Sequence, residues 1–287
     1  MNTKELLNNF ECNFPLIDPE LHLDIPYKDL EREFFYFLDH PGRLSLYCNN
    51  NKIVKYFLQD RFYYIEKELW KDDNIKVKII ENRCKYLFKC PDELTTYDIL
   101  SGFKKSGIYY GYSGFNPLLA KWFFSKYNTK ICYDPCGGWG HRMLGATEID
   151  KYIYNDLSYH TCAGVNNIKQ CFDFFNCDIH NEDARTFMPI EDFDTMFTCP
   201  PYYNLETYEC GDFSSRKEFD IFLDLLFDKF ESKDSCVVFG IVMREDLIGN
   251  HTDYVEMIPL KMHKAEHLLK KNSEKHANEY LYVYRKP

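Results

Sequence analysis

A glycine-rich segment, YDPCGGWGH at positions 133–141, has residue types suited to holding a ligand. It follows a short apolar run, and glycine lets the backbone approach a ligand closely because it has no Cβ and tolerates positive φ. The segment has neither the G-x-G-x-x-G spacing of dinucleotide sites nor the G-K-[ST] ending of a P-loop. It therefore predicts a ligand site of another kind.

Two carboxylates follow this segment at points where further strands are expected to end. Asp156 comes directly after an apolar run, and an acid in that place can accept both hydroxyls of a ribose. Asp183, in Glu182-Asp183-Ala184, could accept the amino group of an adenine. Their order and spacing after the glycines favour a nucleoside-containing ligand.

A proline-rich segment, Thr198-Cys199-Pro200-Pro201-Tyr202, makes the pattern more specific. It resembles the [DNS]-P-P-[YF] catalytic motif of amino-methylating DNA methyltransferases, and positions 134–140 resemble the D-P-F-x-G-S-G cofactor motif of that family. Asn116-Pro117 is similar to the cofactor motif that precedes the glycine turn, and positions 279–286 are similar to the family's terminal strand. The resemblance covers roughly positions 113–286.

The resemblance implies S-adenosylmethionine as cofactor and methyl transfer to the exocyclic amino group of a flipped base in DNA. It implies cofactor-binding residues at Asn116, Pro117, Asp134, Pro135, Cys136, Gly138, Gly140, Asp156, Asp183 and Ala184. The catalytic residues would be Cys199, Pro200, Pro201 and Tyr202, and Tyr202, Tyr203, Asn204 and Arg216 would contact the substrate. No metal is expected.

The motif's composition suits chemistry at an amine whose lone pair is delocalised into a ring. Acceptors around the N–H groups, the Pro200 carbonyl and the group at Cys199, would draw off positive charge as the methyl arrives. The prolines stiffen the turn without adding a competing N–H, and Tyr202 offers a face for a flipped base.

Two positions depart from the family pattern. Cys199 stands where Asp, Asn or Ser is usual, and a thiol is a weak acceptor; Trp139 replaces a small residue in the glycine turn. The order Cys-Pro-Pro-Tyr excludes the Pro-Cys nucleophile of cytosine-C5 enzymes. Because cysteine is closest in size to serine, N4-cytosine is slightly favoured over N6-adenine as the target. A methyltransferase acting on RNA or protein amino groups, and a degenerate DNA-binding accessory protein, remain alternatives.

Composition bounds the class of protein. The 287 residues are 45% hydrophobic and 28% charged with a net charge of −10, which suits a globular protein and argues against one that coats nucleic acid non-specifically. A local basic strip at positions 261–276 is one candidate DNA contact. No secretory leader, membrane span or zinc spacing is evident, so the twelve cysteines are expected to be thiols in the cytoplasm. A homodimer or a partner subunit remains open.

Alternating strand and helix patterns predict a doubly wound, mostly parallel α/β sheet, which the resemblance makes a seven-stranded methyltransferase sheet. Strands are expected at 129–133, 152–154, 193–198, 235–242 and 280–284, and helices at 118–127 and 218–230. Residues 106–287 would form the catalytic domain. Residues 1–105, with helices expected at 52–70 and 94–103 and a further short apolar pattern at 74–87, would form a smaller, mainly helical region that recognises the target.

Overall fold

The computed structural model describes residues 54, 57, 58, 64–109, 114–171, 176–203, 213–260 and 279–287. The described residues divide into two compact units between Phe115 and Asn116. The basic strip at 261–276, about half of the helix expected at 52–70 and Asn204 lie outside the described residues.

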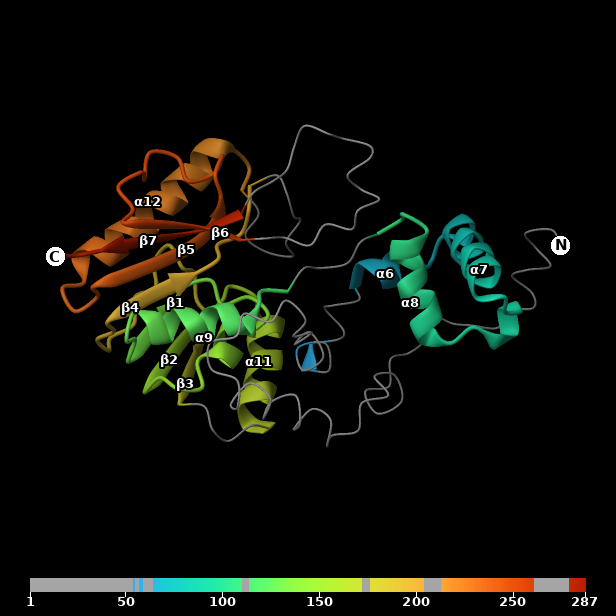
Figure 1. Ribbon diagram of the computed structural model, residues 1–287, viewed down its shortest axis with the longest axis horizontal. Coiled ribbons are helices and arrows are strands. Elements are labelled where there is room, and N and C mark those ends of the chain that lie inside the picture. Colours follow the sequence, from blue (N-terminus) through green and yellow to red (C-terminus); the bar gives the residue numbers. More distant parts are fainter. Residues whose placement is uncertain are drawn as a thin grey trace. The chain divides into compact units, whose positions relative to one another are not determined.

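The larger unit is built on one seven-stranded sheet with the order β3-β2-β1-β4-β5-β7-β6 (Figure 1). Strands β1 to β5 pair in parallel, and β7 pairs antiparallel with both β5 and β6. The strands are β1 Ile131–Asp134, β2 Lys151–Asn155, β3 Cys177–His180, β4 Thr195–Thr198, β5 Val238–Arg244, β6 Glu256–Leu260 and β7 Glu279–Arg285. The expected α/β sheet, mostly parallel and seven-stranded, is confirmed.

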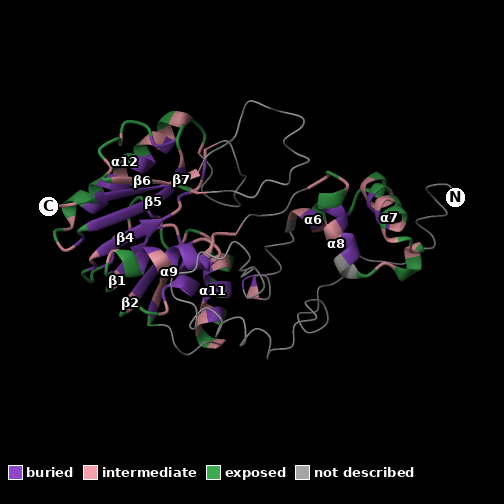
Figure 2. Cartoon of the chain, in the orientation of Figure 1, coloured by how far each residue is buried: buried purple, intermediate pink, exposed green. Residues whose placement is uncertain are grey.

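Helices cover both faces of this sheet, because side chains alternate between the faces along each strand. On one face the ring of Phe123 in α9 stacks on Phe197 of β4 at 4.2 Å between centroids. On the other, Phe227 of α12 meets Phe239 of β5 at 5.1 Å. The helices of this unit are α9 Pro117–Lys126, α10 His141–Gly145, α11 Tyr159–Cys171 and α12 Arg216–Ser232. The purple strands of Figure 2 show that the core lies along the sheet.

Strands β3 and β6 and helices α10 and α11 were not identified from the sequence. Strand β3 has only one buried residue at its first position, and β6 alternates between partly buried and exposed residues and contains Pro259 at the edge of the sheet. Neither therefore has a strong apolar pattern. The strands that were expected lie within a few residues of their predicted bounds, and β7 adds one residue at each end.

The smaller unit is helical in its described part. It contains α6 Tyr64–Leu69, α7 Asp73–Leu87, the short helix η1 Pro91–Glu93 and α8 Thr96–Lys105. Asp72 and Thr95 cap α7 and α8 through their side chains. Trp70, Ile79 and Phe103 are buried between the helices, so this unit has a small core of its own.

None of the nine cysteines that the structure describes is in a disulfide. Among the described helices, none has both the length and the apolar composition needed to cross a bilayer.

Candidate active site

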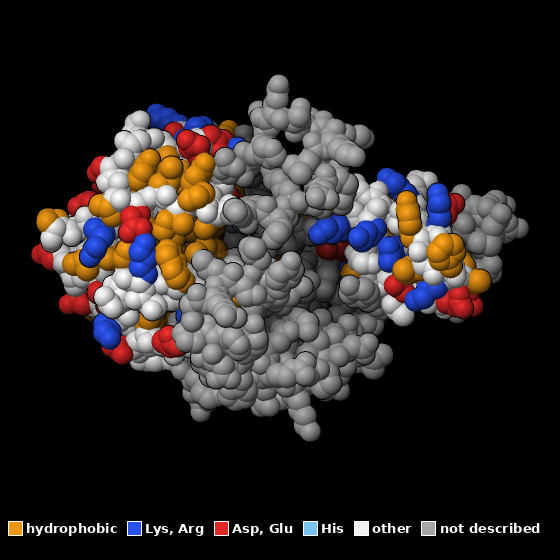
Figure 3. All heavy atoms as spheres, in the orientation of Figure 1, with side chains coloured by type: hydrophobic (Ala, Val, Ile, Leu, Met, Phe, Trp, Pro, Cys, Tyr) orange, Lys and Arg blue, Asp and Glu red, His pale blue; other side chains and the backbone are white. Residues whose placement is uncertain are grey.

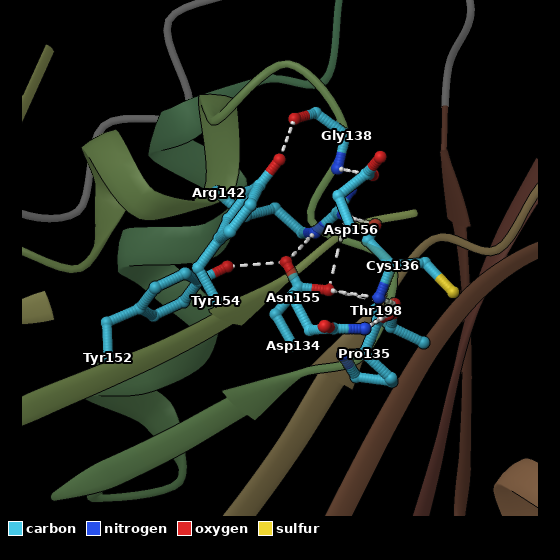
Figure 4. A network of polar contacts seen from close by, with 10 residues as sticks. All are labelled: Asp134, Pro135, Cys136, Gly138, Arg142, Tyr152, Tyr154, Asn155, Asp156 and Thr198. Carbon is cyan, nitrogen blue, oxygen red and sulfur yellow. Dashed lines mark hydrogen bonds and ion pairs between the residues drawn. The ribbon is translucent and has the colours of Figure 1, made fainter. Parts of the chain in front are cut away.

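A buried carboxylate, Asp134 at the end of β1, organises the glycine-rich turn (Figure 4). It accepts hydrogen bonds from Arg142 Nε at 2.7 Å, from Thr198 Oγ1 at 2.9 Å and from the Tyr152 hydroxyl. The backbone N–H of Cys136 donates to the same carboxylate at 3.3 Å. With 0% of its surface exposed and these donors around it, Asp134 holds the turn together rather than presenting itself to a ligand.

The charge on Asp134 is compensated by Arg142, which is itself buried in α10. Burial alone would lower the pKa of the Arg142 guanidinium, but the Asp134 carboxylate raises it. Burial, and then the same carboxylate, raises the pKa of the Tyr152 hydroxyl, which therefore stays a donor. Removing one member of such a pair leaves an uncompensated buried charge, which is strongly destabilising.

Thr198 joins the glycine turn to the proline-rich segment. Its hydroxyl donates to Asp134 Oδ1 and accepts from the backbone N–H of Cys136 at 3.2 Å. Strands β1 and β4 are parallel neighbours, so their carboxyl ends meet at one edge of the sheet. Thr198 thus fixes the segment that begins at Cys199 beside the glycine turn.

Asn155, at the end of β2, ties the glycine turn to the chain after β3. Its side-chain amide donates to the carbonyls of Pro135 and Glu182, each at 3.0 Å, and its amide oxygen accepts from Glu182 N at 3.1 Å. The backbone N–H of Gly137 donates to the Asn155 carbonyl at 2.7 Å. Three strand ends are therefore held in register before any ligand binds.

The open part of the turn is at Gly138 and Asp156. Gly138 has φ of +56°, and a Cβ placed on it would meet no atom within 4 Å. Its N–H donates to Asp156 Oδ2 at 2.9 Å, and Ser158 N donates to Oδ1 at 2.9 Å. Each Asp156 oxygen has a second lone pair. The two residues therefore leave space and acceptor capacity for a hydroxyl-bearing ligand.

Burial raises the pKa of Asp156, against the two backbone N–H groups that lower it.

Gly137 is needed for close packing, because a Cβ there would overlap the buried ring of Tyr154. The Tyr154 hydroxyl in turn donates to the Gly138 carbonyl at 2.6 Å. Tyr154 of β2 therefore helps to fix the conformation of the glycine-rich turn.

The third expected acid is in a different situation. The Asp183 carboxylate is held by Arg185 through Nε at 2.9 Å and Nη2 at 2.6 Å, and this ion pair lowers its pKa. An adenine amino group at Asp183 would have to share or displace the Arg185 guanidinium. The side chain of Ala184 is buried in the core of the unit.

Asn116 and Pro117 form the start of α9. The Asn116 side chain accepts from Leu118 N at 3.0 Å and caps the helix, while Pro117 occupies its first turn. The Pro117 carbonyl lies against Gly145 of α10, where a Cβ would approach it to 2.3 Å. These residues therefore place α9 next to the helix that contains Arg142.

Beyond β4, the proline-rich segment contacts the first residue of β7. The Tyr202 hydroxyl donates to Glu279 Oε1 at 3.0 Å, and the Cys199 thiol donates to the Tyr202 hydroxyl at 3.8 Å. Tyr202 is buried, so its face is not exposed in the way expected of a platform for a base; Tyr203 is partly exposed. Burial first, and then Cys199 and Glu279, raise the pKa of Tyr202.

Arg216, expected to contact the substrate, fastens α12 to the segment after β5. Its guanidinium donates to Asp220 at 2.7 Å and to the carbonyls of Asp246 at 2.8 Å and Leu247 at 3.3 Å. Arg216 is thus held by the fold, and the structure does not bring it together with the residues around Asp134.

Several organising residues were not singled out from the sequence: Arg142, Tyr152, Thr198 and Glu279. Their types are common, and nothing in their spacing marks them. Only Thr198 had a usable signal, since it directly precedes the proline-rich segment at the end of a strand.

The sequence matches no family model and no curated protein. Solved structures of similar chain arrangement include TrmN from Thermus thermophilus, at 15% identity and a TM-score of 0.44, over 60% of this chain and 49% of that one. A putative class I S-adenosylmethionine-dependent methyltransferase from Listeria monocytogenes is 10% identical with a TM-score of 0.46, over 90% and 88%. A putative methyltransferase from Streptococcus mutans in complex with SAH is 10% identical with a TM-score of 0.41, over 61% and 100%.

The chain thus spans about half the length of the Thermus thermophilus protein. At these identities and TM-scores the similarities carry no conclusion about activity or substrate.

The Thr198 hydroxyl can be tested with Thr198→Val, which keeps the shape of the side chain. Asp134 and Cys136 N would each lose a buried partner, so we expect the free energy of unfolding to fall by about 1–2 kcal/mol. Urea denaturation measures the free energy of unfolding. Thr→Val variants at other buried threonines give the reference for replacing a hydroxyl by a methyl group. Unchanged stability would mean that the hydrogen bond at 2.9 Å contributes nothing to the turn.

Proposed function

We propose that the chain is an S-adenosylmethionine-dependent methyltransferase that modifies an exocyclic amino group of a base in DNA. The supporting observation is the Thr198–Asp134 hydrogen bond, which sets the Cys-Pro-Pro-Tyr segment beside a glycine turn with open space at Gly138. A cofactor held over that turn and an amine held at the segment would be neighbours.

The residues around the turn fit the cofactor. Asp156 supplies two acceptors for ribose hydroxyls, and Gly138 leaves the space that the backbone approach of a ligand requires. Leu157, which follows Asp156, is 41% exposed and offers apolar surface to an adenine. The Asp183 carboxylate would accept the adenine amino group of the cofactor while it still accepts from Arg185. The bound cofactor supplies an electrophilic methyl group on a sulfonium.

The chemistry asks the protein mainly for positioning. The amine nitrogen would displace the sulfonium sulfur from the methyl carbon, with the electron pair of the C–S bond going to sulfur, and the extra proton on the methylated nitrogen would pass to solvent. The Pro200 carbonyl and Cys199 are the acceptors that we assign to the amine N–H groups. Neither Pro200 nor Pro201 has a backbone N–H that would compete.

Nucleic acid is the substrate class that the smaller unit supports best. Two aromatic side chains at the end of α7 are exposed, Tyr86 by 66% and Phe88 by 96%, and Lys85 Nζ lies 5.9 Å from the Tyr86 ring centroid. Phe88 has φ of +55°, an unusual conformation for a bulky residue. Figure 3 shows basic and hydrophobic side chains interspersed on this unit.

Exposed aromatic rings beside lysines can stack on unpaired bases while the charge contacts phosphate. Within residues 64–109 basic and acidic residues nearly balance, although the whole chain has a net charge of −10. Because stacking on unpaired bases suits RNA as well as a strand opened in DNA, an RNA amino-methyltransferase is the second candidate.

The function is tested by incubating the protein and labelled S-adenosylmethionine with unmodified genomic DNA, and in parallel with total RNA. We expect label in DNA, at N4-methylcytosine or N6-methyladenine by nucleoside mass spectrometry. Label in RNA alone would move the assignment to the second candidate. Binding of the cofactor without transfer to either polymer would contradict the enzymatic proposal.

The raised pKa of Asp156 predicts how cofactor binding depends on pH. Protonation removes the negative charge that accepts the ribose hydroxyls, so affinity should fall as pH is lowered, starting above the ordinary range of an aspartate. Calorimetry across pH on Asp156→Asn should show weak, nearly constant affinity in place of this fall. Asp183→Asn is the comparison, because the lowered pKa of Asp183 keeps it ionised through the same range.

The aromatic surface is tested with the double variant Tyr86→Ala and Phe88→Ala. We expect the Kd for single-stranded oligonucleotide to rise roughly tenfold or more, since stacking contributes about 1–3 kcal/mol per base, while cofactor affinity is unchanged. Ile190→Ala, at a fully exposed side chain of the other unit, is the matched control. Equal oligonucleotide affinity in both variants would exclude this surface.

A further inference from the structure

Cysteine at position 199 raises a problem of hydrogen-bond direction. An amine nucleophile presents N–H donors, so the protein group beside it must act as an acceptor. A thiol can either donate its S–H or accept weakly at sulfur. If the S–H points at the amine, two donors face one another and the acceptor role is lost.

In the described contacts the thiol hydrogen is directed to the Tyr202 hydroxyl. Glu279 Oε1 accepts the Tyr202 hydroxyl hydrogen at 3.0 Å. The Tyr202 oxygen in turn accepts from the Cys199 S–H at 3.8 Å. Glu279 sets the direction of both hydrogen bonds, because an ionised carboxylate can only accept.

Strand pairing holds the carboxylate in this place. Glu279 is the first residue of β7 and lies opposite Arg244, the last residue of β5, in an antiparallel ladder that continues to Arg285. The start of β7 therefore lies at the same edge of the sheet as the carboxyl ends of β4 and β5. The chain of contacts thus begins on a rigid strand and not on a loop.

We propose that Glu279 is a positioning residue that, through the Tyr202 hydroxyl, orients the Cys199 thiol so that its sulfur lone pairs accept from the substrate amine. This inference rests on the proposed function, and it explains how a thiol can serve at a position where an acceptor is needed. Glu279 acts through Tyr202 and does not itself touch the substrate.

A direct readout, independent of activity, is the rate at which Cys199 is alkylated by iodoacetamide in the protein without ligands. In Glu279→Leu the Tyr202 hydroxyl loses the acceptor at 3.0 Å, and its hydrogen can turn to donate to the Cys199 thiolate, which stabilises the thiolate. Because the thiolate is the reactive form, alkylation at neutral pH should rise by about tenfold. The rate is measured by mass spectrometry of the peptide containing Cys199, with exposed Cys90 of the other unit as internal standard.

Two variants separate hydrogen-bond direction from charge. Glu279→Gln removes the charge but keeps an amide oxygen for the Tyr202 hydroxyl, so its alkylation rate should stay much closer to the original. Tyr202→Phe in the Glu279→Leu background should remove most of the increase. Equal rates in Glu279→Gln and Glu279→Leu, or no change in either, would overturn the proposal whether or not the protein proves to be a methyltransferase.

Kinetics on the modified polymer give the second readout. Glu279→Leu should lower kcat by about tenfold to a hundredfold, the range for one misdirected hydrogen bond in a transition state, with cofactor Kd unchanged. In a Cys199→Asn background, where a carbonyl oxygen can accept without help, the same substitution should cost little. An equal loss in both backgrounds would contradict the proposal.

Glu256→Leu serves as the structural control. Glu256 is a carboxylate of the neighbouring strand β6 that pairs with Lys126, outside the site, and its loss should leave kcat and Cys199 alkylation unchanged. Thermal melting of all variants checks that they fold. A wild-type protein that transfers no methyl group would refute the proposed function, and the alkylation rates would still decide the orientation of the thiol.

Discussion

The site depends on the buried carboxylate of Asp134. Burying a charge costs several kcal/mol unless partners in good geometry replace water, and here the replacements come from four different places in the fold: α10, β2, β4 and the turn itself. Each donor is useful only if its own element is correctly placed. One carboxylate therefore couples the placement of a helix and three strands, β1, β2 and β4, which makes the turn rigid without any ligand.

The location of this carboxylate follows from the topology of the sheet. The order β3-β2-β1-β4-β5 reverses direction between β1 and β4, and in open α/β sheets a crevice forms outside the strand ends at such a reversal. The Asp134–Thr198 hydrogen bond lies across that point. Glycine turn and proline-rich segment, 62 residues apart when counted from Cys136 to Thr198, are neighbours because the strands that precede them are.

Sequence patterns predicted the strands with continuous apolar runs, β1, β2, β4 and β5, since buried parallel strands need such runs. They missed β3 and β6, whose residues are mostly half-buried or exposed. At the site, the spacing identified the glycine turn and Asp156. Spacing did not distinguish Asp134, which is fully buried and paired with Arg142, from Asp156, which is partly exposed and accepts only from backbone N–H groups in the described contacts, because burial and partners are set by the packed fold. The roles of Arg142 and Glu279 become visible only once the strands are paired.

The same reasoning bears on Cys199. A carboxylate at position 199 would lie across Tyr202 from Glu279, and two like charges on either side of one hydroxyl would compete for its single hydrogen. A neutral side chain that can donate to Tyr202 avoids this competition. Cys199 and Glu279 are therefore better understood as one arrangement. The carboxylate lies on β7 and accepts a hydrogen bond from the Tyr202 hydroxyl of the proline-rich segment at 3.0 Å. In the site that we propose, a residue other than an acid at position 199 is compatible with methyl transfer, because β7 places the Glu279 carboxylate at the same edge of the sheet.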